Sequence, residues 1–98
     1  MRFTTYEQVA HALMVVKRDG RREPWDREKL ARGIRIACAK RPISADALER
    51  LVDQIEDKVL GMGRGEVRSE QIGQLVLEGL KELDPVAYIR YGIVYLAL

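Results

Sequence analysis

Cysteine and histidine are almost absent from this chain of 98 residues, which holds one of each, Cys38 and His11. A single thiol can form neither an internal disulfide nor a cysteine-based zinc site, so the composition favours a reducing cytoplasm. A lone histidine leaves no Ser-His-Asp or Cys-His set, and no carboxylates accompany it at metal-ligand spacing. We therefore expect a protein that is not an enzyme, with Cys38 as a small core residue.

Long hydrophobic runs are absent as well. The longest apolar stretch, YGIVYLAL at residues 91–98, is far too short to cross a bilayer, and no signal-peptide pattern opens the chain. With 47% hydrophobic and 33% charged residues, the composition is that of an ordinary globular domain.

Charge is divided unevenly along the chain. Residues 1–41 hold eleven Lys/Arg and five Asp/Glu, a surplus of +6, whereas residues 42–98 hold six and ten, or −4, and together they give the net charge of +2. An anionic partner is therefore expected at the N-terminal half.

The order of the elements predicts an α+β fold, in which a small three-stranded sheet (a hairpin plus a short third strand) covers a bundle of about four helices. The strand ALMVV (12–16), the dipeptide Asp19-Gly20 and the segment RREPW (21–25) predict a hairpin with a two-residue type I′ turn. Pro24 lacks a backbone N–H, which places the second strand at an edge of the sheet. The segment EVR (66–68) is expected to form the third strand.

Four amphipathic helical segments surround or follow these strands. Asp26 is expected to cap the first, which ends by Arg41-Pro42; Ser44 and Ser69 are expected to cap the second and third; Asp84-Pro85 begins the fourth. The glycine-rich segment GMGRGE (61–66) follows a helix and lacks a Gly-Lys-Ser/Thr ending, so a connector is favoured over a phosphate loop. The residues expected to face inward are Leu30, Ile34, Ala37 and Cys38; Leu48, Leu51, Val52, Ile55 and Val59; Ile72, Leu75, Val76, Leu80 and Leu83; and Val86, Ile89, Ile93 and Leu96.

The hairpin is rich in cations, with Lys17, Arg18, Arg21 and Arg22 around its turn and Lys29 one turn into the following helix. Converging Lys and Arg side chains suit a triphosphate. The same charges could instead protect an exposed sheet edge from pairing with other chains. The spacing alone leaves both explanations open.

Tyrosines are concentrated in the last helix, where Tyr88, Tyr91 and Tyr95 recur at three- and four-residue spacing beside Arg90 and Gly92. Such rings suit adenine stacking or a subunit interface. Half-burial of the rings against the sheet explains the spacing equally well.

Three segments together resemble the ATP-cone, the adenine-nucleotide-sensing domain of ribonucleotide reductases: VVKRDGRREPWDREKL (15–30), KRPIS (40–44) and EVRSEQIGQLVLEGLKELDPVAYIRYGIVY (66–95). The opening RFTTYE (2–7) and the ending LDPVAYIRYGIVY are most similar to the cone of the NrdR family, bacterial repressors of ribonucleotide reductase genes. The resemblance implies that residues 1–10 are the remnant of a linker after an N-terminal zinc ribbon and that residues 11–98 form the cone. The four ribbon cysteines and the family's C-terminal tail are missing from this chain, and Trp25 stands where the family more often has phenylalanine.

The resemblance also implies a function: a regulatory domain that senses ATP and dATP, with nucleotide binding controlling homo-oligomeric state and thereby binding to promoter DNA of ribonucleotide reductase genes in the intact protein. Mg²⁺ is expected with the triphosphate, and Zn²⁺ only in the missing ribbon. The alternatives are the allosteric cone of a reductase itself, a small basic nucleic-acid-binding module, and a purely structural oligomerisation domain. The implied nucleotide-binding residues are Lys17, Arg18, Arg22 and Lys29 for the phosphates, Glu23 for a ribose hydroxyl or for orienting a lysine, Val15 and Val16 beside the adenine, and Ser69 closing the pocket, with Trp25, Tyr88, Tyr91 and Tyr95 as pocket wall or oligomer contacts.

Overall fold

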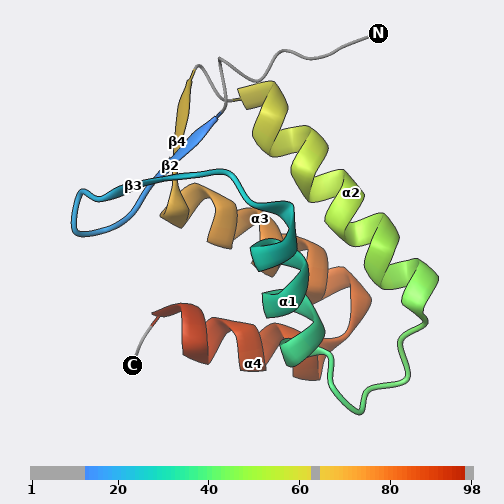
Figure 1. The fold of residues 1–98 in the computed structure, drawn as a ribbon. Coiled ribbons are helices and arrows are strands. Elements are labelled where there is room, and N and C mark those ends of the chain that lie inside the picture. Colours follow the sequence, from blue (N-terminus) through green and yellow to red (C-terminus); the bar gives the residue numbers. More distant parts are fainter. Residues whose placement is uncertain (1–12, 63–64, 97–98) are drawn as a thin grey trace, which may run out of the picture.

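The fold combines a small sheet with four helices, as the sequence predicts (Figure 1). A computed structural model describes residues 13–62 and 65–96, so His11 and the expected linker at residues 1–10 lie outside the described residues. No helix within these ranges is both long and apolar enough to span a membrane. The elements, in chain order, are β2 (Met14–Val16), β3 (Arg22–Pro24), α1 (Arg27–Ala37), α2 (Ala45–Met62), β4 (Glu66–Arg68), α3 (Ser69–Leu83) and α4 (Pro85–Leu96).

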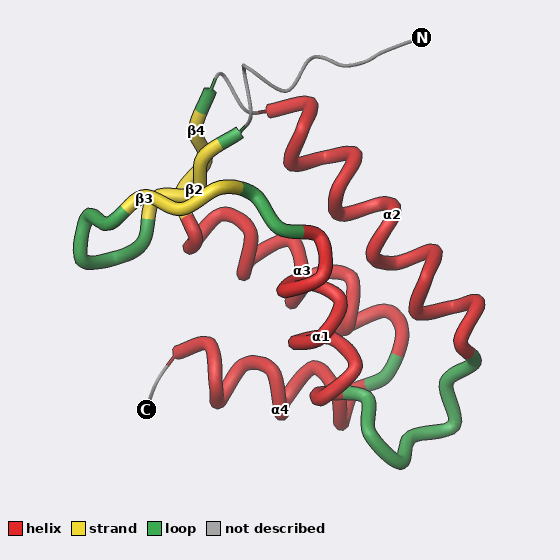
Figure 2. The backbone as a smooth tube through the Cα atoms, in the orientation of Figure 1, coloured by secondary structure: helices red, strands yellow, loops and turns green. Residues whose placement is uncertain are grey.

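The sheet has the strand order β3-β2-β4 and lies beside the N-terminal ends of α1 and α3 (Figure 2). Val15, in the central strand, is paired with Glu23 in an antiparallel register and with Val67 in a parallel one. Val15 and Val67 are buried against the helices. The expected edge position of β3 and the third strand at EVR are both confirmed.

The hairpin turn differs from the prediction. The Lys17 N–H donates to the Arg21 carbonyl at 2.8 Å and the Gly20 N–H donates to the Lys17 carbonyl at 2.9 Å, so the turn has three residues rather than two. Gly20 has a φ of 91°, and Asp19 is not among the residues with positive φ. The predicted type I′ turn is therefore wrong. A three-residue turn needs one left-handed residue, and the Asp19 carboxylate stabilises it by accepting the Arg21 N–H at 3.0 Å.

The first two helices begin where their caps predict. Asp26 Oδ1 accepts the Glu28 N–H at 2.9 Å, and Ser44 Oγ accepts the Ala47 N–H at 3.0 Å. Helix α1 ends at Ala37, before Arg41-Pro42, as predicted. The inward faces of α1 and α2 are confirmed, since their predicted residues are buried or packed against the core.

The third helix begins one residue earlier than predicted, at Ser69 itself. Arg68 occupies the cap position and its N–H donates to Gln71 Oε1 at 3.0 Å, whereas Ser69 is already the first helical residue. The predicted Ser69 cap is therefore wrong. Strand β4 runs directly into α3, so Arg68 belongs to the strand and no separate capping residue intervenes.

The inner face of α4 was also predicted incorrectly. Ala87 is fully buried and Tyr88 and Tyr91 pack against the core, whereas Ile89 and Ile93 are each 57% exposed. Apolar residues occupy several sides of this helix, so helical spacing alone does not identify the buried side. The small Ala87 lets the backbone of α4 approach its neighbours closely.

Asp84 connects the segment between α1 and α2 to the start of α4. Its carboxylate accepts the Arg41 Nε and Nη2 hydrogens at 2.9 and 3.1 Å, and Oδ2 also accepts the Ala87 N–H at 3.0 Å, which confirms Asp84-Pro85 as the start of α4. These bonds, first from Arg41 and then from the Ala87 backbone, lower the pKa of this buried carboxyl group. The guanidinium of Arg90 reinforces the same region by donating to the Ala39 carbonyl at 2.7 Å, beyond the end of α1.

We predict that Asp84→Asn lowers the Tm by roughly 5–10 °C, because the substitution removes the charge from a buried, bidentate pair. A lowered folded-state pKa stabilises the fold above the unfolded pKa, about 4, and this contribution is lost as pH falls through the folded value. Wild type should therefore lose more stability than Asp84→Asn between pH 5 and 3, measured by thermal melts followed by circular dichroism. The control is Glu82→Gln, at an exposed position close in sequence. If Asp84→Asn and Glu82→Gln lost the same stability over this pH range, the role assigned to Asp84 would be contradicted.

Candidate functional site

The inner face of the hairpin borders a cavity of about 470 Å³. The cavity lies among the hairpin, the first turns of α1 and α3, and the last turns of α4. Its volume falls within the range of small-molecule sites. The lining residues are Val15, Lys17, Arg18, Asp19, Arg21, Glu23, Pro24, Trp25, Asp26, Lys29, Leu30, Ser69, Ile72, Gly73, Tyr91 and Tyr95.

Cations from two elements converge on this cavity. Lys17, Arg18 and Arg21 come from the hairpin turn, and Lys29 comes from α1. The Lys29 ammonium reaches back to the sheet, as expected, and lies 2.8 Å from Glu23 Oε1. This hydrogen bond lowers the pKa of Glu23, so the carboxylate is charged at neutral pH.

Arg18 connects the hairpin to the end of α4. Its guanidinium carbon lies 5.4 Å from the centre of the Tyr95 ring, and its Nη2 donates to the Tyr95 carbonyl at 3.3 Å. Oε2 of Glu70, at the start of α3, lies 3.9 Å from Arg18 Nε. A cation beside the last carbonyls of a helix is favourably placed for the helix dipole.

Two tyrosines of α4 form one wall. The rings of Tyr91 and Tyr95 are stacked, with centres 6.1 Å apart, and the Tyr95 hydroxyl donates to the Glu70 carbonyl at 2.8 Å. Burial raises the pKa of Tyr91, which keeps its hydroxyl neutral. The rest of this side is apolar and includes Leu30 and Ile72.

The predicted site residues divide into two groups. Those that line the cavity are Val15, Lys17, Arg18, Glu23, Lys29, Ser69, Trp25, Tyr91 and Tyr95. Val16, Arg22 and Tyr88 are outside the lining; Arg22 Nε instead lies 3.1 Å from Glu66 Oε2, and Tyr88 packs against the core. Residues alternate between the two faces of a strand, so Val16 and Arg22 cannot share the face of Val15 and Glu23.

Several lining residues were not predicted. Arg21 and Asp19 belong to the cavity because the three-residue turn brings Arg21 opposite Lys17, on the same face. Asp-Gly is compatible with this turn as well as with a two-residue one, so the dipeptide predicts a hairpin turn but not its length. The contributions of Ile72 and Gly73 depend on the distant pairing of β2 with β4, for which the sequence carries no local signal.

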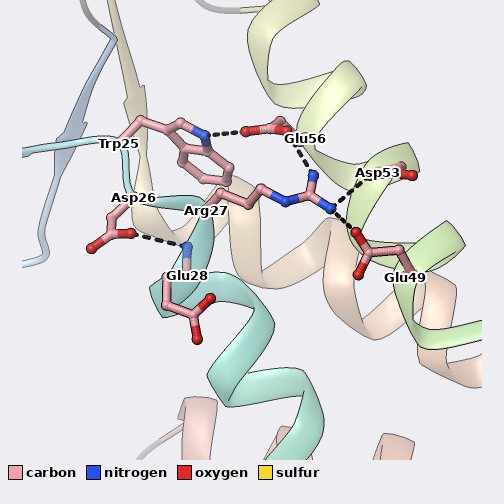
Figure 3. Close-up of polar contacts among 7 residues, drawn as sticks. All are labelled: Trp25, Asp26, Arg27, Glu28, Glu49, Asp53 and Glu56. Carbon is pink, nitrogen blue, oxygen red and sulfur yellow. Dashed lines mark hydrogen bonds and ion pairs between the residues drawn. The ribbon is translucent and has the colours of Figure 1, made fainter. Parts of the chain in front are cut away.

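An ion cluster joins Arg27 of α1 to three carboxylates of α2, one of which also contacts Trp25 (Figure 3). The Arg27 guanidinium makes contacts of 2.6, 2.7 and 2.8 Å with Glu49, Asp53 and Glu56. Hydrogen bonds to Asp53 and Glu56, followed by Glu49, raise the pKa of Arg27. Glu56 Oε2 also accepts the indole N–H of Trp25 at 2.8 Å.

The cavity lining combines charged and apolar groups that can recognise a ligand. Four cations and a helix N-terminus suit an anionic group, and the apolar and aromatic residues of the same lining suit a flat ring. Among the residues that the structure describes, no group of His, Cys, Asp or Glu could hold a metal ion. The arrangement fits a ligand with an anionic end and a planar apolar end.

Comparison with known proteins agrees with this geometry. A family model described as the ATP cone domain matches residues 13–98, and the chain belongs to the ATP-cone family. The resemblance stated from the sequence is thereby confirmed, together with the α+β fold.

More specifically, the relatives are named transcriptional repressors. The chain is 55% identical to the transcriptional repressor NrdR of Chloroflexus aggregans over 95 residues, which is 96% of this chain and 55% of the relative. It is 53% identical to that of Chloroflexus aurantiacus over 97 residues, covering 98% and 58%, and 52% identical to that of Rhodospirillum rubrum over 95 residues, covering 96% and 62%. The chain thus spans little more than half the length of these curated relatives.

We predict that Gly73→Ala displaces Tyr95, because a Cβ at this position would lie 2.0 Å from Cε1 of that ring. Alanine normally stabilises a helix interior relative to glycine, but the clash should reverse the sign and cost about 1–3 kcal/mol. Chemical denaturation of Gly73→Ala and of the double variant Gly73→Ala/Tyr95→Ala measures the effect. Rescue by the second substitution is expected, and a stabilised single variant would refute the packing.

Proposed function

We propose that this cavity binds ATP and dATP, and that the domain serves as the nucleotide sensor of a transcriptional repressor of ribonucleotide reductase genes. The observation that carries the proposal is the convergence of Lys17, Arg18, Arg21 and Lys29 on one cavity that also has apolar and aromatic lining residues, in a chain of the ATP-cone family. The cations would hold the phosphates, and the apolar side would hold the base.

The charge of the cavity bears on how a triphosphate would bind. Four cationic side chains share the lining with three carboxylates, Asp19, Glu23 and Asp26. Asp19 is paired with Arg21 at 2.7 Å and Glu23 with Lys29, so much of the positive charge is neutralised internally. A triphosphate would therefore have to replace these carboxylates as the partner of Lys29 and Arg21. Mg²⁺ bound to the phosphates, rather than to a protein cage, would offset the remaining negative charge.

Base and ribose would occupy the side away from the turn. Val15 and Trp25 would border the base, and Ser69, in the first turn of α3, would close the pocket. Glu23, once released from Lys29, would accept a hydrogen bond from a ribose hydroxyl. ATP and dATP differ by one such hydroxyl, and a buried partner left unpaired by dATP costs about 1–3 kcal/mol.

The output of the sensor would be a change of homo-oligomeric state. Tyr91 and Tyr95 of α4 line the cavity, while Ile89, Ile93 and Val94 of the same helix are exposed. One helix therefore contacts the cavity on one side and presents apolar surface on another. Assembly of the intact protein would control its binding to promoter DNA. We assign this role to a bacterial protein in the cytoplasm. Its zinc ribbon, the expected site of Zn²⁺, would supply the DNA contacts.

A small basic nucleic-acid-binding module receives less support from the same geometry. Arg22, Arg27 and Arg41 each form ion pairs with carboxylates of the acidic half of the chain. These pairs remove cations from the surface that a nucleic acid would need. The similarity to named transcriptional repressors likewise favours the cone of a repressor over the cone of a reductase.

We predict that Lys17→Ala and Lys29→Ala each weaken the binding of ATP and dATP by roughly 10- to 100-fold, the effect of losing a charged hydrogen bond to phosphate. Isothermal titration calorimetry in the presence of Mg²⁺ measures the affinities. Arg22→Ala tests the remaining phosphate assignment: its position outside the cavity favours less than about a threefold change. Lys81→Ala, in the last turn of α3, is the control. Unchanged affinity in both lysine variants would remove the cavity from consideration.

We also predict that ATP and dATP produce particles of different mass, because only differential affinity for two assemblies can shift their equilibrium. Light scattering after size-exclusion chromatography, with each nucleotide in the running buffer, measures this mass. Ile93→Glu should abolish the larger species and leave the calorimetric affinity within about threefold of wild type, since Ile93 lies outside the cavity. Identical masses with tight binding of both nucleotides would rule out assembly as the output.

A further inference from the structure

We infer that Glu56 of α2 is a positioning residue for the ligand site, acting through Trp25. The inference rests on the proposed function, since it concerns how the cavity presents an apolar wall to a nucleotide. Glu56 is outside the cavity lining, whereas Trp25 is part of it. Glu56, on α2, would thus determine the orientation of the Trp25 ring without itself lining the cavity.

The contact geometry supports this assignment. The Trp25 indole N–H donates to Glu56 Oε2 at 2.8 Å, and the other carboxylate oxygen, Oε1, accepts from Arg27 Nη1 at 2.8 Å. Figure 3 shows Trp25 and Arg27 extending side by side from the start of α1 and converging on Glu56. The Glu56 side chain is only 23% exposed. A carboxylate with both oxygens engaged has little freedom to rotate, so it is a well-defined acceptor.

Arg27 holds Glu56 in place through its other partners. The same guanidinium contacts Glu49 and Asp53, which lie on the same face of α2 as Glu56. Glu49 and Asp53 have no recorded contact with Trp25 among the described side-chain hydrogen bonds. This distinction separates two roles: all three carboxylates bind Arg27, but Glu56 also binds the indole.

The indole needs such an anchor because of its position. Trp25 lies outside the strand and helix that flank it, and its ring is half-buried between the cavity and α2. Two side-chain torsions determine where the ring lies. Without an acceptor, the indole N–H would lose a partner in a partly buried position, and rotation of the ring toward water would change the shape of the apolar wall.

The test compares ATP affinity with the state of the indole N–H. Trp25 is the single tryptophan of the chain, so a ¹H–¹⁵N spectrum contains one indole resonance to follow. Glu56→Leu and Glu56→Ala should shift this resonance, speed its hydrogen exchange and weaken ATP binding by about three- to tenfold. Glu56→Gln keeps an acceptor and should bind ATP within about twofold of wild type.

Two further variants isolate the indole contact. Glu49→Leu removes a partner of Arg27 from the same helix face and should leave both the resonance and the affinity unchanged. In a Trp25→Phe background, which retains an aromatic ring but no N–H, Glu56→Leu should have no additional effect on affinity.

The outcomes separate this inference from the proposed function. Wild-type ATP affinity in Glu56→Leu and Glu56→Ala, with a shifted indole resonance, would overturn the positioning role and leave nucleotide binding intact. An equal loss of affinity in Glu49→Leu would assign the effect to the Arg27 cluster as a whole and also overturn it. If wild type with a normal indole resonance binds neither ATP nor dATP, the proposed function fails and the inference fails with it.

Discussion

The parallel pairing of β2 with β4 is the constraint on which the rest of the structure depends. Each strand has three residues, and the register joins Val15 to Val67 across more than half of the chain. This pairing places the start of α3 beside the hairpin, so that Ser69 and Ile72 share a cavity with Lys17. A hairpin alone would be marginally stable and would have no opposite wall. Because β4 runs directly into α3, the pairing of the strand and the position of the helix N-terminus are one event rather than two.

Opposite charges in the two halves of the chain are used mainly to join those halves. Arg27 binds three carboxylates of α2, Arg41 binds Asp84, and Arg22 binds Glu66. Exposed pairs of this kind contribute little individually, and the buried, bidentate contact with Asp84 is the strongest candidate for a large effect. Within the described residues, these pairs offset part of the positive surplus of the N-terminal half. Cations concentrate around the hairpin cavity, where Lys17, Arg18 and Lys29 meet.

Local signals predicted much of this fold, and the errors occur where the deciding contact is distant. Asp26 and Ser44 cap their helices as expected, because a cap depends on residues two or three positions away. The inner face of α4 was wrong because apolar residues lie on several of its sides, and only the position of α1 and α3 determines that Ala87 is buried and Ile89 exposed. For the candidate site, strand alternation and helical reach place Glu23 and Lys29 together, whereas the contact between Trp25 and Glu56 requires the position of α2.

The tyrosines and the aliphatic residues of α4 lie on different sides of the same helix. Tyr91 and Tyr95 belong to the cavity wall, whereas the exposed surface of α4 is the aliphatic one around Ile89, Ile93 and Val94, which the proposed function assigns to assembly. Arg18 connects the hairpin side of the cavity to α4, because it lines the cavity and also contacts the carbonyl and the ring of Tyr95. A polyanion that attracts Arg18 would compete directly with its contacts to α4. Under the proposed function, a difference of about 1.4 kcal/mol between two ligands in this competition changes the ratio of two assemblies tenfold, so no large rearrangement of the core is required.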